Sequence, residues 1–103
     1  MNISTTYENG MLVAFPAGEL DEHSAELVRR ELDPKIINDN NYSALVFDLS
    51  RLSFMDSTGI GVVIGRYKLA RRHNKQVYVR HPSETVDKIF KMSGLYEIIG
   101  KIN

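Results

Sequence analysis

Hydrophobic and polar residues form short blocks along the chain, and the first two blocks predict a β-hairpin. Residues 2–7 alternate weakly, and the apolar run 11–15 follows them after Asn9-Gly10. Asn-Gly between two strand-like segments is typical of a two-residue type I′ turn, because both central residues of that turn need positive φ. The chain is therefore expected to open with an antiparallel pair of strands, and residues 16–18 are expected to close the second strand.

A helix is predicted after the hairpin. Asp21 is a candidate N-cap for a helix from Glu22 to about Leu32, because its side chain can accept a hydrogen bond from a free N–H of the first turn. The side chains expected on the inward face are Ala25, Val28 and Leu32. Asp33-Pro34 is expected to end or kink the helix, since the residue before proline is pushed out of the α region. Residues 36–37 would add one more turn before the polar loop 38–41.

The middle of the chain predicts a buried strand followed by a second helix. The run 44–49 is apolar, with β-branched and aromatic members, which is typical of a strand covered on both faces. Residues 50–55 are expected to form a connecting loop. Apolar residues then recur with a helical period from Thr58 onward, at Ile60, Val63, Ile64 and Tyr67. Asp56, Ser57 and Thr58 are each candidates for the N-cap of this helix.

The last third predicts another strand, another helix and a short final strand. Residues 76–79 form the strand pattern, and Pro82 and Ser83 start a helix whose inward face carries Val86, Ile89 and Phe90. Gly94 is expected to stop this helix, and residues 96–99 to form the last strand. The element order indicates one α/β domain spanning 1–103, with about three helices packed on a mixed sheet that has an antiparallel N-terminal edge.

Composition narrows the function classes. The chain has 103 residues, of which 43% are hydrophobic and 25% charged, and its formal net charge is zero. Neutral bulk charge does not favour nucleic acid or a membrane as partner. There is no cysteine, and no apolar segment is long enough for a membrane span, so a cytoplasmic protein is expected. The three histidines lack the spacing of metal ligands, and neither a metal nor a cofactor is expected.

Charge is distributed unevenly along the chain. The first 28 residues carry five acidic residues and no Lys or Arg, whereas residues 57–83 carry six basic residues and no acidic one. The basic residues are Arg66, Lys68, Arg71, Arg72, Lys75 and Arg80. A solvated helix end whose cations complement the C-terminal dipole is favoured over a nucleic-acid patch, because no series of stacking aromatic residues accompanies them.

The segment 55–59, Met-Asp-Ser-Thr-Gly, carries the candidate chemistry. It places an acid and two hydroxyls where a buried strand leads into a helix, and a helix N-terminus favours negative charge. Ser57 therefore lies where a phosphate is tolerated. Gly61 and Gly65 inside the same helix each cost up to about 1 kcal/mol against alanine. Close packing of this helix on the sheet is the favoured explanation, and room for a partner is the alternative.

Four blocks of sequence together resemble the STAS-domain anti-sigma-factor antagonists. They are Gly18-Glu19-Leu20-Asp21, residues 52–61, residues 65–68 and residues 92–95, in the family's order. The Asp-Ser-Thr-Gly segment after a buried strand is the most specific of the four. The chain is most similar to the sporulation antagonists of the sigma-F pathway, with the general stress-response antagonists as the alternative.

The resemblance implies a protein without catalytic activity that binds an anti-sigma factor, itself a serine kinase, and so frees a sigma factor. Phosphorylation at Ser57 by that kinase would inactivate it, and a PP2C-type phosphatase would restore it. Asp21 matches an acidic loop position that helps to dock the partner. The implied partner-binding residues are Asp21, Asp56, Ser57, Thr58, Gly59, Ile60 and Gly61. The free protein is expected to be a monomer.

The alternative from a different class is an enzyme. A small hydrolase using Asp56, of the dimeric aspartic protease kind, is disfavoured because such enzymes place glycine two residues after the acid, whereas Thr58 precedes Gly59 here. Ser57 also has no histidine paired with it in a recognisable motif, which argues against a hydrolase nucleophile. Asp48, which ends an apolar strand, is expected to support the Ser57 loop by hydrogen bonding.

Overall fold

An antiparallel hairpin begins the chain, as the Asn-Gly pair predicts. The computed structural model describes all 103 residues, and strands β1 (Asn2–Glu8) and β2 (Met11–Leu20) pair from Asn2 opposite Ala17 to Glu8 opposite Met11. Asn9 and Gly10 have φ of 51° and 77°, the left-handed values that this turn needs. The hairpin forms one edge of the sheet.

One mixed sheet of six strands organises the domain. Beyond the hairpin the other elements are α1 (Ala25–Asn38), β3 (Ala44–Asp48), β4 (Leu52–Met55), α2 (Ser57–Arg72), β5 (Gln76–Arg80), α3 (Glu84–Met92), the 3₁₀ turn η1 (Leu95–Glu97) and β6 (Gly100–Ile102). The strand order is β1-β2-β3-β5-β6, and β4 pairs with the far end of β2. All pairs except β1 with β2 are parallel. The predicted α/β class, the antiparallel edge and the three helices are thus confirmed.

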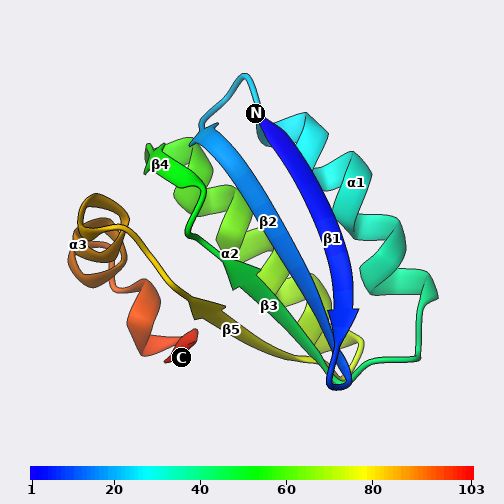
Figure 1. Cartoon of the computed structure of the whole chain (residues 1–103). Helices are drawn as coiled ribbons and strands as arrows, with labels where there is room; N and C mark the ends of the chain where they lie inside the picture. The colour runs from blue at the N-terminus through cyan, green and yellow to red at the C-terminus, as the bar shows by residue number, and fades with distance from the viewer.

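The hydrophobic core lies between the sheet and the helices. Figure 1 shows α1 and α2 side by side behind the sheet. Helix α3 lies apart from them at the left of the view, on the side of the domain where β4 lies, and it contacts β4. A single cluster of 22 buried apolar residues fills this space, and it includes the predicted inward side chains Val28 and Leu32 of α1. No helix in the domain is long and apolar enough to cross a membrane.

Two strand boundaries were predicted wrongly. Strand β2 does not close at residues 16–18 but continues to Leu20, and residues 52–55 are strand β4 rather than loop. The two departures have one cause, because the extension of β2 pairs with β4, from Gly18 opposite Leu52 to Leu20 opposite Met55. Leu52 and Met55, at the two ends of β4, are both 2% exposed, so this short pairing is held by burial of its end residues.

Helix α1 begins later and ends later than predicted. It starts at Ala25 rather than Glu22, and it continues through Pro34 to Asn38. Pro34 lies on the exposed side, whereas Ile36, two positions later and on the opposite side of the helix, is fully buried in the core. Burial of an isoleucine is worth about 1.5–3 kcal/mol, which offsets a cost of about 3 kcal/mol for an interior proline. The final strand is also displaced, because residues 95–97 form a 3₁₀ turn and β6 begins only at Gly100.

Candidate functional site

The ends of two parallel strands bring Asp21 and Asp56 to the same edge of the sheet. Asp21 follows Leu20, the last residue of β2, and Asp56 follows Met55, the last residue of β4; these two last residues are paired in register. The Asp56 N–H also donates to the Leu20 carbonyl at 3.3 Å. The sequence predicted both acids as site residues, but their proximity depends on the pairing of β2 with β4.

Asp56 is the N-cap of α2, so one of the three candidate caps is confirmed. Its Oδ1 accepts from the Gly59 N–H at 2.9 Å, and its carbonyl accepts from the Ile60 N–H at 2.9 Å. Ser57 is consequently the first residue of the helix and is exposed to solvent, while Thr58 is half-buried. The N–H groups of Ser57 and Thr58 are left without partners inside the helix, which gives this end its partial positive charge.

Gly59 is the glycine on which the close approach of α2 to the sheet depends. A Cβ at this position would lie 2.2 Å from the Leu20 carbonyl oxygen, so no larger residue fits without moving the end of β2. A Cβ at Gly61 or Gly65 would meet nothing within 4 Å. The favoured explanation of Gly61 and Gly65 by close packing on the sheet is therefore wrong, and both open onto solvent.

Asp21 does not cap α1 directly but shapes the turn that precedes the helix. Its Oδ1 accepts from the N–H groups of His23 at 2.9 Å and Ser24 at 3.1 Å. Partial burial acts to raise the pKa of Asp21, but the hydrogen bonds from Ser24 and His23 outweigh it and lower the pKa below its usual value. These hydrogen bonds therefore favour the ionised form of the Asp21 carboxyl.

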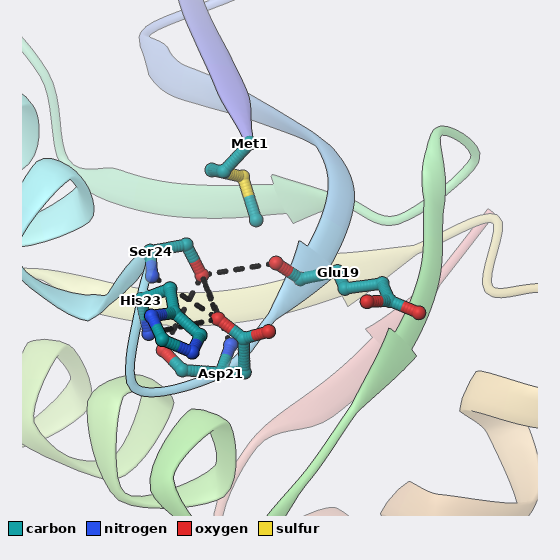
Figure 2. Close-up of a pocket in the computed structure, with 5 residues that line it drawn as sticks. All are labelled: Met1, Glu19, Asp21, His23 and Ser24. Carbon is teal, nitrogen blue, oxygen red and sulfur yellow. Dashed lines mark hydrogen bonds between the residues drawn. The ribbon is translucent and has the colours of Figure 1, made fainter.

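A small acidic hollow opens beside this turn. Figure 2 shows the five residues that line it, Met1, Glu19, Asp21, His23 and Ser24, around a volume of about 190 Å³. The Ser24 hydroxyl donates to the Glu19 carbonyl at 2.9 Å and so ties the two sides of the hollow together. Of the residues lining the hollow, only Asp21 was assigned to the site by sequence reasoning, and the missed members of this region include Glu19 and its strand partner Phe54. They face each other in the β2–β4 register, and Phe54 is 44% exposed.

The seven predicted partner-binding residues fall into exposed and supporting groups. Ser57 and Gly61 are exposed, Asp21, Asp56, Thr58 and Ile60 are half-buried, and Gly59 is buried. The first six lie at the end of β2 or around the start of α2, although Ile60 also packs against the core. Gly59 instead contributes by allowing the helix to approach Leu20. None of these carboxylates belongs to a cluster of three or more side chains that could hold a metal ion.

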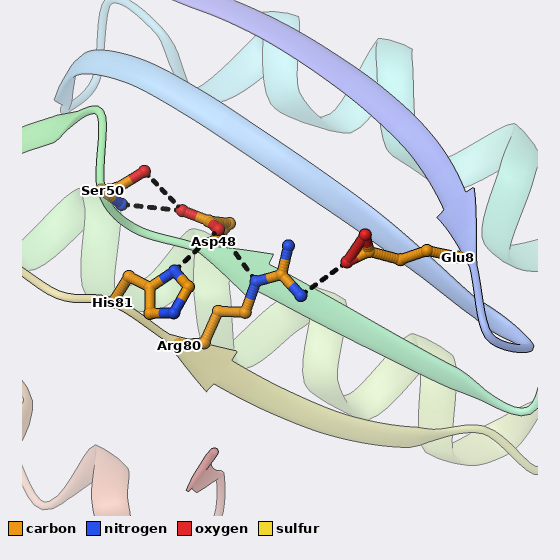
Figure 3. Close-up of polar contacts among 5 residues, drawn as sticks. All are labelled: Glu8, Asp48, Ser50, Arg80 and His81. Atoms are coloured by element: carbon orange, nitrogen blue, oxygen red, sulfur yellow. Dashed lines mark hydrogen bonds and ion pairs between the residues drawn. The ribbon is translucent and has the colours of Figure 1, made fainter. Parts of the chain in front are cut away.

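Asp48 supports the connection that leads to Ser57 at its first residue, Ser50, and makes no hydrogen bond to residues 55–59 themselves. Figure 3 shows its carboxylate accepting from the Ser50 N–H and hydroxyl at 3.0 and 2.6 Å, and from Arg80 Nε at 2.8 Å, with His81 Nδ1 at 3.2 Å. Arg80 also bonds Glu8 at 2.6 Å. Burial acts to raise the pKa of Asp48, but the hydrogen bonds from Ser50 and Arg80 lower it to about 2. The network joins β1, β3 and β5 and fixes the turn that leads into β4.

Comparison with known proteins places this geometry in a family. The STAS domain profile matches residues 2–103, so the chain belongs to the STAS domain family. The anti-sigma F factor antagonist of Paenibacillus polymyxa is 34% identical over 99 residues, which cover 96% of this chain and 84% of that protein. The anti-sigma-B factor antagonist of Staphylococcus aureus is 26% identical over 96% of this chain and 90% of that protein. Among STAS domains, the chain is of the anti-sigma factor antagonist type.

Solved structures agree with this assignment. The unphosphorylated anti-sigma factor antagonist SpoIIAA superposes with a TM-score of 0.73 and 25% identity, covering 99% of this chain and 88% of that chain. The phosphorylated form of the Bacillus cell fate determinant SpoIIAA matches with the same TM-score and 28% identity, over 99% and 92% of the two chains. An anti-sigma factor antagonist of Mycobacterium paratuberculosis shares the fold, with a TM-score of 0.82 at 20% identity over 97% and 85%.

Proposed function

We propose that this protein is a phosphorylation-controlled antagonist of an anti-sigma factor. In its unphosphorylated form it binds an anti-sigma factor that is also a serine kinase, and so frees a sigma factor. Phosphorylation of Ser57 by that kinase abolishes binding, and a PP2C-type phosphatase restores it. The observation that carries the proposal is the exposed Ser57 hydroxyl at the first position of α2, next to the acidic residues that follow β2 and β4.

The position of Ser57 explains why a phosphate leaves the fold intact. Phosphorylation adds about 1.5–2 negative charges and three acceptor oxygens. The Ser57 and Thr58 N–H groups and the helix dipole stabilise an anion at this position. The hydroxyl is exposed, so the added group displaces no core side chain. We therefore expect the phosphorylated domain to keep its structure.

The same position explains why a phosphate blocks docking. Asp56 already occupies the cap of α2, and Asp21 and Glu19 line the neighbouring hollow, so the surface around Ser57 is acidic. An acidic rim fits basic side chains of a partner. A bulky hydrated dianion at its centre prevents close contact, and a loss of about 3 kcal/mol weakens binding more than a hundredfold. The proposed switch is therefore exclusion at the surface, not a change of fold.

The sporulation sigma-F switch is the favoured setting, and the general stress response is the alternative. Relatives named anti-sigma F factor antagonist are 34% and 36% identical to this chain, whereas those named anti-sigma-B factor antagonist are 26% identical. The difference in identity supports the first setting. The test is to compare binding to the anti-sigma factor kinase of each type.

The experiment begins with the purified protein, the anti-sigma factor kinase and ATP. Mass spectrometry is expected to find one phosphate, on Ser57, and none on a Ser57→Ala variant. In a calorimetric titration Ser57→Ala is expected to bind the kinase like the wild type, and Ser57→Asp to bind more than a hundredfold more weakly. Thr85→Asp is a matched control, because it adds the same charge to an exposed hydroxyl position in the first turn of α3.

Gly61 provides a second test at the same surface. Because a Cβ at Gly61 meets no atom within 4 Å, Gly61→Ala is expected to leave the fold intact while adding a methyl group to the docking face. Weaker binding at an unchanged or higher melting temperature supports the interface. Tight binding of the kinase by Ser57→Asp, or phosphate on a residue other than Ser57, would refute the proposal.

A further inference from the structure

The six basic residues between positions 57 and 83 divide into two groups in the structure. Three are used internally. Arg66 pairs with Asp33 at 2.7 Å, Lys75 donates to two backbone carbonyls at 2.8 and 2.9 Å, and Arg80 pairs with Asp48 at 2.8 Å. The other three are exposed near the C-terminal end of α2, and they are Lys68, Arg71 and Arg72. Contacts with charged groups or buried carbonyls of the domain therefore account for the first group only.

The exposed basic residues continue the face of α2 that begins at Ser57. Residues 59, 62, 63, 66 and 70 are the buried face of this helix. Ser57, Gly61, Lys68 and Arg72 are all exposed and recur at helical spacing on the opposite side. No other element covers the helix at Gly61 or Gly65, where a Cβ would meet nothing within 4 Å. The face is a continuous, unpartnered strip from the phosphorylation site to the basic end.

The basic end of this strip is not neutralised by the domain itself. Several exposed cations on the other helices form ion pairs, as Lys88 does with Glu84 and Lys91 with Asp87. Lys68 and Arg72 form no ion pair, and Arg71 bonds only the neutral Gln76, at 2.8 Å. These three residues and Tyr67 line a shallow hollow of about 420 Å³. The dipole of α2 favours cations in its last turn, but Lys68 lies before that turn.

We propose that the anti-sigma factor docks along the whole exposed face of α2 and presents an acidic patch to Lys68, Arg71 and Arg72. This inference rests on the proposed function and adds the orientation of the complex. The acidic rim at Asp21 and Asp56 and this basic end form two poles of opposite charge on one docking surface. A partner with complementary poles binds in one direction only, because the reverse orientation places like charges together.

The dimensions of the helix allow one partner to reach both poles. Lys68 is eleven positions after Ser57, which corresponds to about 16 Å along the helix axis. A standard protein interface covers about 800 Å² on each partner, a patch about 30 Å across. A patch centred near Gly61 therefore reaches Ser57 at one side and the basic end at its rim. Charges at the rim of an interface act mainly on the association rate and on its salt dependence.

The test is a double charge reversal, Lys68→Glu with Arg72→Glu, measured by stopped-flow association with the anti-sigma factor kinase. Arg71 is left unchanged because it bonds Gln76. Association is expected to slow by about tenfold or more at low salt, and the difference from wild type to shrink as salt is raised. The control is Arg30→Glu with Lys88→Glu, which makes the same change of net charge at exposed positions of α1 and α3.

Each outcome has a distinct meaning. Equal association rates for the reversal and the control, with wild-type binding still dependent on Ser57, would overturn this inference and leave the proposed function intact. No binding by the wild type would refute the proposed function. Binding of duplex DNA that the reversal abolishes while kinase binding is unchanged would assign the basic end to nucleic acid instead. Lys68→Gln with Arg72→Gln, which removes charge without adding repulsion, is expected to give a smaller slowing and guards against misfolding of the reversal.

Discussion

Two glycines two residues apart in α2 are expected to respond in opposite directions to the same methyl group. Gly59 is buried against the end of β2, and a Cβ there would lie 2.2 Å from the Leu20 carbonyl oxygen and 3.0 Å from its carbonyl carbon. Gly61, in the next half turn, has open space in the same test. Alanine at either position gains the helix propensity that glycine lacks, up to about 1 kcal/mol. Only the contact with Leu20 distinguishes the two substitutions.

The size of the effect at Gly59 follows from that contact. The obstructing atom belongs to the backbone of β2, so it cannot turn aside as a flexible side chain would, and overpacking of this kind costs about 1–3 kcal/mol. Displacing Leu20 also weakens the hydrogen bond from the Asp56 N–H to the Leu20 carbonyl, worth about 1 kcal/mol. After the propensity gain, a net loss of about 2 kcal/mol is expected for Gly59→Ala. Gly61→Ala is expected to stabilise by up to about 1 kcal/mol.

Urea unfolding monitored by circular dichroism measures the free energy of unfolding of each variant, and a thermal melt measures its melting temperature. For a domain of this size, 1 kcal/mol corresponds to about 4–8 °C in melting temperature, so Gly59→Ala should melt roughly 10 °C lower and Gly61→Ala a few degrees higher. A Gly59→Ala protein as stable as the wild type would show that α2 does not rest on the end of β2. Equal shifts for the two variants would show that propensity alone governs this helix.

Two further predictions concern buried charges. Asp48→Asn is expected to lower the free energy of unfolding by up to about 2 kcal/mol at neutral pH, because the pKa of Asp48 falls from 3.8 to about 2 on folding. A pKa that is lower in the folded state stabilises the folded protein fully above pH 3.8 and no longer below about pH 2. The difference in unfolding free energy between wild type and Asp48→Asn should therefore shrink as the pH falls toward 2. A difference that stays constant across that range in urea titrations would contradict the role given to Asp48. Asp33→Leu leaves Arg66 buried without its partner and should lower the free energy of unfolding by about 3 kcal/mol. The double variant Asp33→Leu with Arg66→Met should recover most of that loss. A double variant as unstable as the single one would show that the pair itself is needed.

Much of the secondary structure could be predicted because its causes are local. The Asn9-Gly10 turn, the Ser83 cap of α3 and the left-handed Gly94 each follow from the conformational preferences of one or two residues. Ser83 Oγ accepts from the Val86 N–H at 3.2 Å, as a cap should. Asp56 belongs to the same class, although three neighbouring residues competed for its role. Periodicity does not distinguish between adjacent hydroxyl and carboxyl caps.

The errors arose where a distant segment decided the local structure. Residues 52–55 are a strand because the extension of β2 offers them a partner, and that partner lies more than thirty positions earlier in the chain. Helix α1 continues through Pro34 because Ile36 finds a place in the core. Gly61 and Gly65 were expected to pack on the sheet, and the glycine with that role is Gly59. In each case burial against another element outweighed the local preference.

The sequence by itself determined the α/β class, the antiparallel edge and the helix that begins at the Asp-Ser-Thr-Gly segment, because these follow from periodicity, capping chemistry and motif. It also supplied Ser57 as the proposed phosphorylation site. Only the tertiary structure decided that Asp21 and Asp56 lie at the neighbouring ends of β2 and β4. It also decided which basic residues bond within the domain, namely Arg66, Lys75 and Arg80. The basic residues that remain exposed are Lys68, Arg71 and Arg72. The physical reason is that a residue's type fixes what it can bond, whereas packing of remote segments fixes which partners come within reach.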